Sequence, residues 1–487
     1  VKLVSSLPSE RAQSVMAEGG INAALNTKDE NDSPEEHFTD TIKAACGLAD
    51  PNAVWGMTQA APELVHWLLK LGVKFNMSGY DDVDLRNFGG QKKKRTAFAQ
   101  SDTGKQIMTA MIDAVRRKEA SGMVERFSHH SFLTLRLCGN ICCGCVIRDE
   151  YSQETVELPG DAVIVATGGM HGLFGNTTGS LNNTGEVTAE LFRLGVPLAN
   201  GEMIQYHPTT VKCGGKRMLI SEAARGEGGR LFAMKDGKQW YFMEEKYPEL
   251  GNLMPRDITA REIWKVSHES EVFLDMTEIS EEIISNKLSG LADDCMTYLH
   301  KDIRKEPVSV LPGIHYFMGG ILVDEQHRTP IQNLYAAGEC CAQYHGANRL
   351  GGNSLLGALY GGRVAAKSAC EQVDVVDLSC ATQIDFPPAS QISEIKQLNK
   401  VMQETMGVVR NENTLLNGIQ TVQALTGNLP LLGMAVLKSA LARKESRGAH
   451  WREDYPKSND DDYLKTTVAR FDGKQIQISF VPVPERR

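Results

Sequence analysis

The chain reads DAVIVATGG at Asp161–Gly169 and NLYAAGE at Asn333–Glu339. Each run is apolar, has the length of a strand and ends near glycine, which is typical of a strand buried on both faces of a parallel sheet. Glycine-rich sequence and then a small-residue helix through Ala366 follow the second run. Because α/β proteins bind ligands at the carboxyl ends of such strands, the two runs predict an α/β fold with a ligand site beside the glycines.

The sequence around these two runs predicts further elements. Val1–Ser5 is a short strand, residues 34–75 form helices that begin after the cap residue Ser33, and residues 131–149 form a β-hairpin. Pro387-Pro388 marks a linker, and residues 392–443 are helical in pattern. We therefore expect a helical region after the α/β part.

The composition of the 487 residues is that of a folded globular protein, with 41% apolar and 23% charged residues. The formal net charge of −9 disfavours binding to nucleic acid, and no apolar run is long enough to span a bilayer, so we expect no direct membrane insertion. Eleven cysteines, an odd number spread along the chain, indicate free thiols of a reducing compartment. The expected location is the cytoplasm.

Two sets of residues indicate a cofactor enzyme with an anionic substrate. Three glycine pairs let backbone amides approach a ligand, and two of them follow strand-like runs, which favours a dinucleotide. These pairs are Gly19-Gly20, Gly168-Gly169 and Gly351-Gly352. Five cationic or titratable side chains lie in turn-rich stretches, where binding groups concentrate. They are His207, Arg225, Arg256, His315 and Arg349.

Other polar clusters are interpreted as structural. Cys142 and Cys145 have C-x-x-C spacing, but they lie on the predicted hairpin, and no second pair or histidine cluster completes four metal ligands, so we predict no metal site. The basic run at Lys92–Arg95 and the acidic run at Asp460–Asp462 are interpreted as solvated surface.

Five motifs resemble one known family, the flavoprotein subunits of succinate dehydrogenase and fumarate reductase, which also includes L-aspartate oxidase. The motifs are NFGG at Asn87–Gly90 followed by Arg95-Thr96, RGEGG at Arg225–Gly229, HYFMGG at His315–Gly320, HGANRLGGNSL at His345–Leu355 and ESRGAH at Glu445–His450. The resemblance covers nearly the whole chain. It implies a Rossmann-like FAD-binding domain interrupted by an α+β capping domain and followed by a helical domain. The implied boundaries are 1–201 and 319–385 for the FAD-binding domain, 202–318 for the capping domain, 386–465 for the helical domain and 466–487 for a C-terminal tail.

The resemblance also implies roles for individual residues. Residues along FAD would be Ser14, Glu18, Gly19, Gly20, Thr167, Gly168, Gly169, Glu186, Glu339, Arg349, Ser354 and Leu355, with Glu186 standing where the family usually has Asp. The carboxylates of a dicarboxylate substrate would meet His207, Ser221, His315 and Arg349, with Phe88 and Gly89 nearby. Arg256 would be the proton donor, supplied through Glu222, with Arg225 as the connection to solvent.

The sequence departs from the family pattern at two places. The family's first strand and its G-x-G-x-x-G turn precede the position of Val1, so we expect an N-terminally incomplete version whose binding of FAD is weakened. Gln13 stands where membrane-complex relatives carry the histidine that bonds to FAD, which predicts non-covalent flavin. A flavin without that bond is expected to have a lower potential, which favours fumarate reduction over succinate oxidation.

These observations lead to one function and two alternatives. The chain is expected to be an FAD-dependent oxidoreductase that interconverts fumarate and succinate. The alternatives are an L-aspartate oxidase and an inactive fragment or scaffold subunit. An iron-sulfur subunit or another electron carrier is the implied redox partner, with the C-terminal helical region as its dock, and such a partner would place the chain at the inner face of the membrane.

Overall fold

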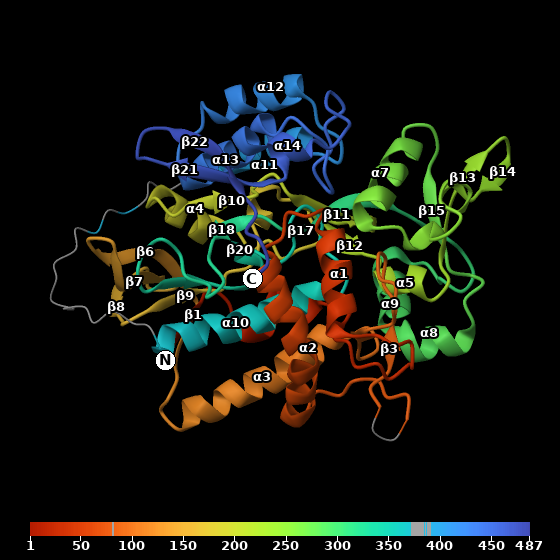
Figure 1. The fold of residues 1–487 in the computed structure, drawn as a ribbon, viewed down its shortest axis with the longest axis horizontal. Helices are drawn as coiled ribbons and strands as arrows, with labels where there is room; N and C mark the ends of the chain where they lie inside the picture. Colours follow the sequence, from red (N-terminus) through yellow and green to blue (C-terminus); the bar gives the residue numbers. More distant parts are fainter. Residues whose placement is uncertain (80–81, 372–383, 385, 387–390) are drawn as a thin grey trace.

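The two ends of the sequence and the predicted core elements can be followed in a computed structural model (Figure 1). It describes residues 1–79, 82–371, 384, 386 and 391–487. The predicted linker at Pro387-Pro388 lies outside the described residues.

The first 120 residues are mainly helical. Strand β1 (Lys2–Ser5) pairs in parallel with β5 (Glu125–Ser128), and three helices follow the first strand. They are α1 (Pro34–Ala44), α2 (Pro51–Leu71) and α3 (Thr103–Ala120). The Ser33 side chain accepts a hydrogen bond from the Glu36 amide at the start of α1, and Gly72 ends α2 with a φ of 101°, as the cap and glycine signals predict.

The predicted hairpin is confirmed and carries a third strand. β6 (His130–Cys138), β7 (Ile141–Asp149) and β8 (Thr155–Pro159) form an antiparallel meander. The two glycine-ended runs form β9 (Val163–Val165) and β19 (Leu334–Ala336), which pair in parallel. The expectation that β9 is buried on both faces is wrong, because Ile164 is 40% exposed and β19 is its only hydrogen-bonded strand among the described residues.

A five-stranded sheet joins the middle of the chain to its end. Its order is β20 (Cys341–Ala342), β18 (Gly320–Leu322), β10 (Leu198–Ala199), β21 (Lys465–Phe471) and β22 (Ile476–Pro482). A small sheet near the first glycine pair has the order β2 (Ile21–Asn22), β4 (Thr96–Ala97) and β3 (Leu85–Arg86). Helix α10 (Asn353–Glu371) begins directly after Gly351-Gly352.

The segment between β10 and β18 has its own hydrophobic core and projects to one side (the green elements of Figure 1). Its sheets are β12 (Lys216–Leu219), β11 (Ile204–Cys213) and β17 (Leu311–Phe317), and β14 (Lys238–Trp240), β13 (Arg230–Lys235), β15 (Val272–Asp275) and β16 (Val308–Ser309). Its helices are α5 (Glu222–Gly226), α6 (Phe242–Lys246), α7 (Arg256–Val266), α8 (Glu281–Lys287) and α9 (Ser289–Asp294).

The C-terminal region is helical, as its apolar spacing predicts. It contains α11 (Ile392–Thr405), α12 (Glu412–Val422), α13 (Asn428–Ala442) and the short α14 (Asp460–Tyr463). Leu398, Met402 and Leu432 belong to a core shared with α4 (Glu186–Arg193). The last strands return to β10, so the end of the chain is packed against the middle of the molecule.

The cysteine expectation is confirmed at nine described positions, which are free thiols, and is wrong at Cys138, which is disulfide-bonded. Within the described ranges, no three His, Cys, Asp or Glu side chains are grouped as metal ligands. No helix in the same ranges is both long and apolar enough to cross a membrane.

Candidate active site

Glu222 lies at the centre of a buried polar cluster. It is the first residue of α5, whose cap is the Ser221 side chain, and it is 2% exposed. Its Oε2 accepts hydrogen bonds from Arg256 Nε at 2.9 Å and from Nη2 at 2.5 Å. Its Oε1 accepts from Arg225 Nη2 and from the Gly89 amide, both at 3.3 Å. One carboxylate therefore serves two guanidinium groups, which hold its pKa below the usual value against the effect of burial.

Arg256 is held from a second side by an amide. It is the first residue of α7, and Pro255 before it favours the start of a helix. Arg256 Nη1 donates to Gln205 Oε1 at 3.1 Å. Gln205 Nε2 donates in turn to Asn348 Oδ1 and to the Arg349 carbonyl, at 2.9 and 2.8 Å. The amide thus connects α7 to the loop that carries Arg349.

Arg349 is a buried cation whose Nε has no hydrogen-bond partner among the residues that the structure describes. It is 3% exposed, and its Cζ lies 4.4 Å from the centre of the Tyr316 ring. Burial lowers its pKa to about 9, and repulsion from Arg256 contributes to the shift. An anion bound between these two guanidinium groups would remove that electrostatic cost.

Two histidines face each other beside the arginines. The ring centres of His207 and His315 are 5.1 Å apart. Burial lowers the pKa of each well below its usual value, and Arg256 lowers both further, so both rings are neutral near pH 7. Nδ1 of His315 is hydrogen-bonded to Thr178 Oγ1 at 2.8 Å, and Nδ1 of His207 accepts a hydrogen bond from the Thr209 amide at 3.3 Å. When Nδ1 accepts, the single proton of the neutral ring is on Nε2, which can then donate to a ligand.

Glycines allow the backbone to approach this cluster closely. A Cβ at Gly89 would lie 2.7 Å from Glu222 Oε1, and one at Gly351 would lie 2.9 Å from Glu222 Oε2. A Cβ at Gly19 would lie 3.2 Å from the Phe88 ring. Packing around Glu222 therefore requires glycine at positions 89 and 351. The contact of Gly19 with Phe88 brings the predicted substrate residues next to the first glycine pair.

The second glycine pair forms a cradle with unpaired polar atoms. Gly168 has a φ of 72°, and a Cβ at Gly169 would lie 2.6 Å from Glu339 Oε1, which accepts a hydrogen bond from the Phe317 amide. Within the part of the chain that the structure describes, several buried side-chain atoms around the glycine pairs have no hydrogen-bond partner. They include Glu18 Oε2, His171 Nε2 and Asn183 Nδ2. Since buried polar atoms are normally paired, this surface fits a polar ligand of the dinucleotide type.

The remaining predicted cofactor residues are spread over three elements. Ser14 lies in the 3₁₀ turn Gln13–Met16, while Ser354 and Leu355 lie in the first turn of α10, after Gly352 with its φ of 83°. Glu186 is exposed and is the first residue of α4. Each of these residues lies in the first turn of its helix or 3₁₀ turn.

One expectation about the proton route is wrong. Arg225 does not itself reach solvent, because its side chain has no exposed surface. Its Nη1 donates to the Asn252 carbonyl at 2.7 Å, which keeps the guanidinium under the loop before α7. Arg225 therefore interacts with Glu222 inside the protein.

Known families match both parts of the chain. The FAD binding domain family matches residues 1–355, and the C-terminal family of fumarate reductase flavoproteins matches residues 425–486. The succinate dehydrogenase flavoprotein subunit of Bacillus subtilis is 37% identical over 100% of this chain and 94% of its own length. This chain belongs to the succinate dehydrogenase and fumarate reductase flavoprotein family.

Solved structures of flavoprotein family members have the same fold. The FrdA chain of E. coli quinol fumarate reductase has a TM-score of 0.88 at 26% identity, covering 99% of this chain and 92% of that one. Sdh1 of Mycobacterium smegmatis has a TM-score of 0.82 at 28% identity, covering 99% and 90%. The predicted α/β class and family are thereby confirmed, and the chain is a flavoprotein oxidoreductase of this family. The individual site residues and domain boundaries stay predictions.

Sequence reasoning missed three residues that shape the site. Gln205, Tyr316 and Asn348 were not assigned, although Tyr316 and Asn348 lie inside quoted motifs. A signal existed for Gln205, because it is two residues before His207 and an alternating strand sends both side chains to the same face. The contact of Tyr316 with Arg349 joins two motifs that are distant in sequence, and no local pattern indicates it.

Proposed function

We propose that this flavoprotein interconverts fumarate and succinate, with fumarate reduction as the favoured direction. The single observation that carries the proposal is the buried group of Arg349, His207 and His315 around Arg256, because it offers fixed donors to a small dicarboxylate. The proposed substrate-binding residues are His207, Ser221, His315 and Arg349, with Phe88 and Gly89 beside them.

FAD held by the predicted cofactor residues would supply the hydride to one alkene carbon of fumarate. The chain's own residues then have two tasks. Arg349 and the two neutral histidines hold the carboxylates and stabilise the negative charge that develops there. Arg256 delivers a proton from its guanidinium to the second alkene carbon, so that hydride and proton together convert fumarate to succinate.

The proton supply rests on Glu222. A free arginine holds its proton too tightly to be a good acid. Glu222 Oε2 lies 2.5 Å from Arg256 Nη2, so the carboxyl group can exchange a proton directly with that nitrogen. After each transfer Glu222 takes up a proton that comes from solvent and passes it to Arg256, which restores both groups, and Arg225 donates a hydrogen bond to the other oxygen of Glu222. Arg256 and Glu222 are therefore the proposed proton-transfer pair.

The flavin is proposed to be non-covalent. Gln13 begins the turn Gln13–Met16, and an amide side chain cannot form the bond that a histidine forms. Electrons are proposed to pass through a partner, an iron-sulfur subunit or another carrier, docked on the C-terminal helices, which would place the chain in the cytoplasm or at the inner face of the membrane. Residues 1–201 and 319–385 are the proposed FAD-binding domain and 202–318 the capping domain.

L-aspartate oxidase is the second candidate. The L-aspartate oxidase of Nostoc is 31% identical over 93% of this chain and 86% of its own length. Turnover of succinate, fumarate and L-aspartate by the flavin-loaded protein tests the choice. Fumarate reduction without aspartate oxidation supports the proposal, and aspartate oxidation without fumarate reduction contradicts it. A purified protein with no flavin absorbance would support the scaffold alternative instead.

A further inference from the structure

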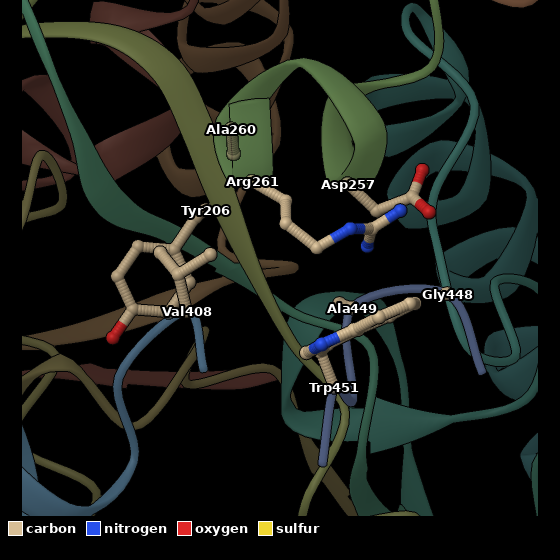
Figure 2. A pocket seen from close by; sticks show the side chains of 8 residues that line it. All are labelled: Tyr206, Asp257, Ala260, Arg261, Val408, Gly448, Ala449 and Trp451. Carbon is tan, nitrogen blue, oxygen red and sulfur yellow. The ribbon is translucent and has the colours of Figure 1, made fainter. Parts of the chain in front are cut away.

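Helix α7, which carries Arg256, also contacts the C-terminal region through another of its faces. Arg261 lies five residues after Arg256, which corresponds to about 7.5 Å along the axis and a different side of the helix. Its Cζ lies 4.0 Å from the centre of the Trp451 ring. Figure 2 shows Arg261 extended from α7 over Trp451, with Asp257 beside its guanidinium.

The segment that contributes Trp451 is firmly anchored. Residues 447–451, named here the 447–451 segment, include a tight turn in which Arg447 and His450 exchange backbone hydrogen bonds. The Trp451 carbonyl accepts from the Arg410 amide at 3.0 Å, and Arg410 Nη1 is 2.9 Å from His450 Nδ1. Arg410 and His450 are both buried. The ring of Trp451 therefore has a fixed base in the C-terminal region.

The same segment holds the loop that carries the other arginine. The Ala449 amide donates to the Ala347 carbonyl at 2.9 Å, and the Ala347 amide donates to the Ala45 carbonyl at 3.0 Å. A Cβ at Gly448 would lie 2.5 Å from the Ala347 carbonyl oxygen, so the approach of the two backbones requires glycine. Ala347 is two residues before Arg349.

We infer that the 447–451 segment positions both arginines of the active site, Arg256 through the stacking of Arg261 on Trp451 and Arg349 through the hydrogen bond from Ala449 to Ala347. The inference rests on the proposed function of Arg256. Trp451 and Arg261 touch neither substrate nor the reacting atoms, so they are positioning residues. A small cavity beside the stack is lined by Tyr206, Asp257 and Trp451 among others (Figure 2).

The test uses the flavin-loaded full chain and the variants Trp451→Leu and Trp451→Phe. Misplacing a catalytic group by about 1 Å can cost about 100-fold in rate. We expect Trp451→Leu to lower kcat per bound flavin about 10- to 100-fold and to change the KM for fumarate less than about twofold, because the hydrogen bond that holds the Arg349 loop is retained. Trp451→Phe keeps an aromatic face for the cation and should restore most of kcat.

Hydrogen exchange gives a second readout that does not depend on turnover. Backbone amides of α7 should exchange faster in Trp451→Leu than in the parent. Tyr241→Leu is the matched control, because Arg230 Cζ lies 3.7 Å from the centre of the Tyr241 ring, elsewhere in residues 202–318. It should leave kcat and α7 exchange unchanged.

Three results separate the inference from the proposed function. Parent kcat and parent α7 exchange in Trp451→Leu would overturn the inference, as would equal loss in Trp451→Phe and Trp451→Leu. Full activity of Arg256→Gln would instead overturn the proposed role of Arg256, whatever the Trp451 variants show.

Discussion

Replacing Glu222 by glutamine tests the centre of the site through both stability and rate. The change keeps the shape of the side chain and removes the charge that pairs with Arg256 and Arg225. Removing one partner of a buried ion pair costs about 3–5 kcal/mol, because the other charge stays buried without compensation. Glutamine keeps one acceptor oxygen, so we expect the lower end, about 3 kcal/mol, which lowers Tm by about 3 °C in a chain of this size.

The rate should fall with the stability. Loss of a general acid–base group typically costs about 100- to 10,000-fold, so we expect Glu222→Gln to retain at most about 1% of fumarate reduction per bound flavin. Circular dichroism during heating gives Tm, and fumarate-dependent oxidation of a reduced viologen dye gives the rate. Glu281→Gln is the control, because its pair with Arg304 is exposed and worth less than about 1 kcal/mol. A Glu222→Gln protein with parent Tm and parent rate would refute the reasoning.

Three further predictions follow from single side chains. Arg256→Lys should abolish turnover and leave the flavin absorbance of the purified protein unchanged, and near-normal activity would remove its role as proton donor. Because Gln13 cannot bond to the flavin, acid precipitation should leave the yellow colour in the supernatant, whereas a yellow pellet would contradict non-covalent binding. Burial raises the pKa of Glu18 to about 8, above the value of about 4.3 in an unfolded chain. Between these two values the folded state binds more protons than the unfolded state, so this group makes stability fall as pH rises. Glu18→Gln should therefore flatten the fall in unfolding free energy between about pH 5 and 8, and a slope equal to that of the parent would count against the burial of this carboxyl.

Local sequence signals were sufficient for some of the elements. Ser33 and Gly72 mark helix ends by hydrogen bonding and backbone conformation that depend only on neighbouring residues. β9 and β19 could be predicted as strands of a parallel sheet because both runs are apolar and end near glycine. That they pair with each other appears only in the structure. The exposure of Ile164 could not be predicted, because it depends on which strands flank β9 in space.

The site was predicted by residue type and not by geometry. The family resemblance implied roles for Arg256, Glu222 and Arg225, but the arrangement of the two arginines around the Glu222 carboxylate appears only in the structure. The burial of Arg225 contradicts its expected contact with solvent, since a side chain on a turn-rich stretch can still be covered by a distant loop. The spacing of Gln205 from His207 could have indicated a shared face, but its partners Arg256 and Asn348 come from two other elements and appear only in the structure.

Anaerobic mixing of the reduced flavoprotein with fumarate tests the central claim most directly. The visible absorbance of the flavin is followed in a stopped-flow instrument, and succinate is measured in the quenched mixture. The account predicts rapid reoxidation of the flavin with one succinate formed per flavin, and no reoxidation in Arg256→Gln. Flavin that stays bound and reduced in the presence of fumarate would contradict it.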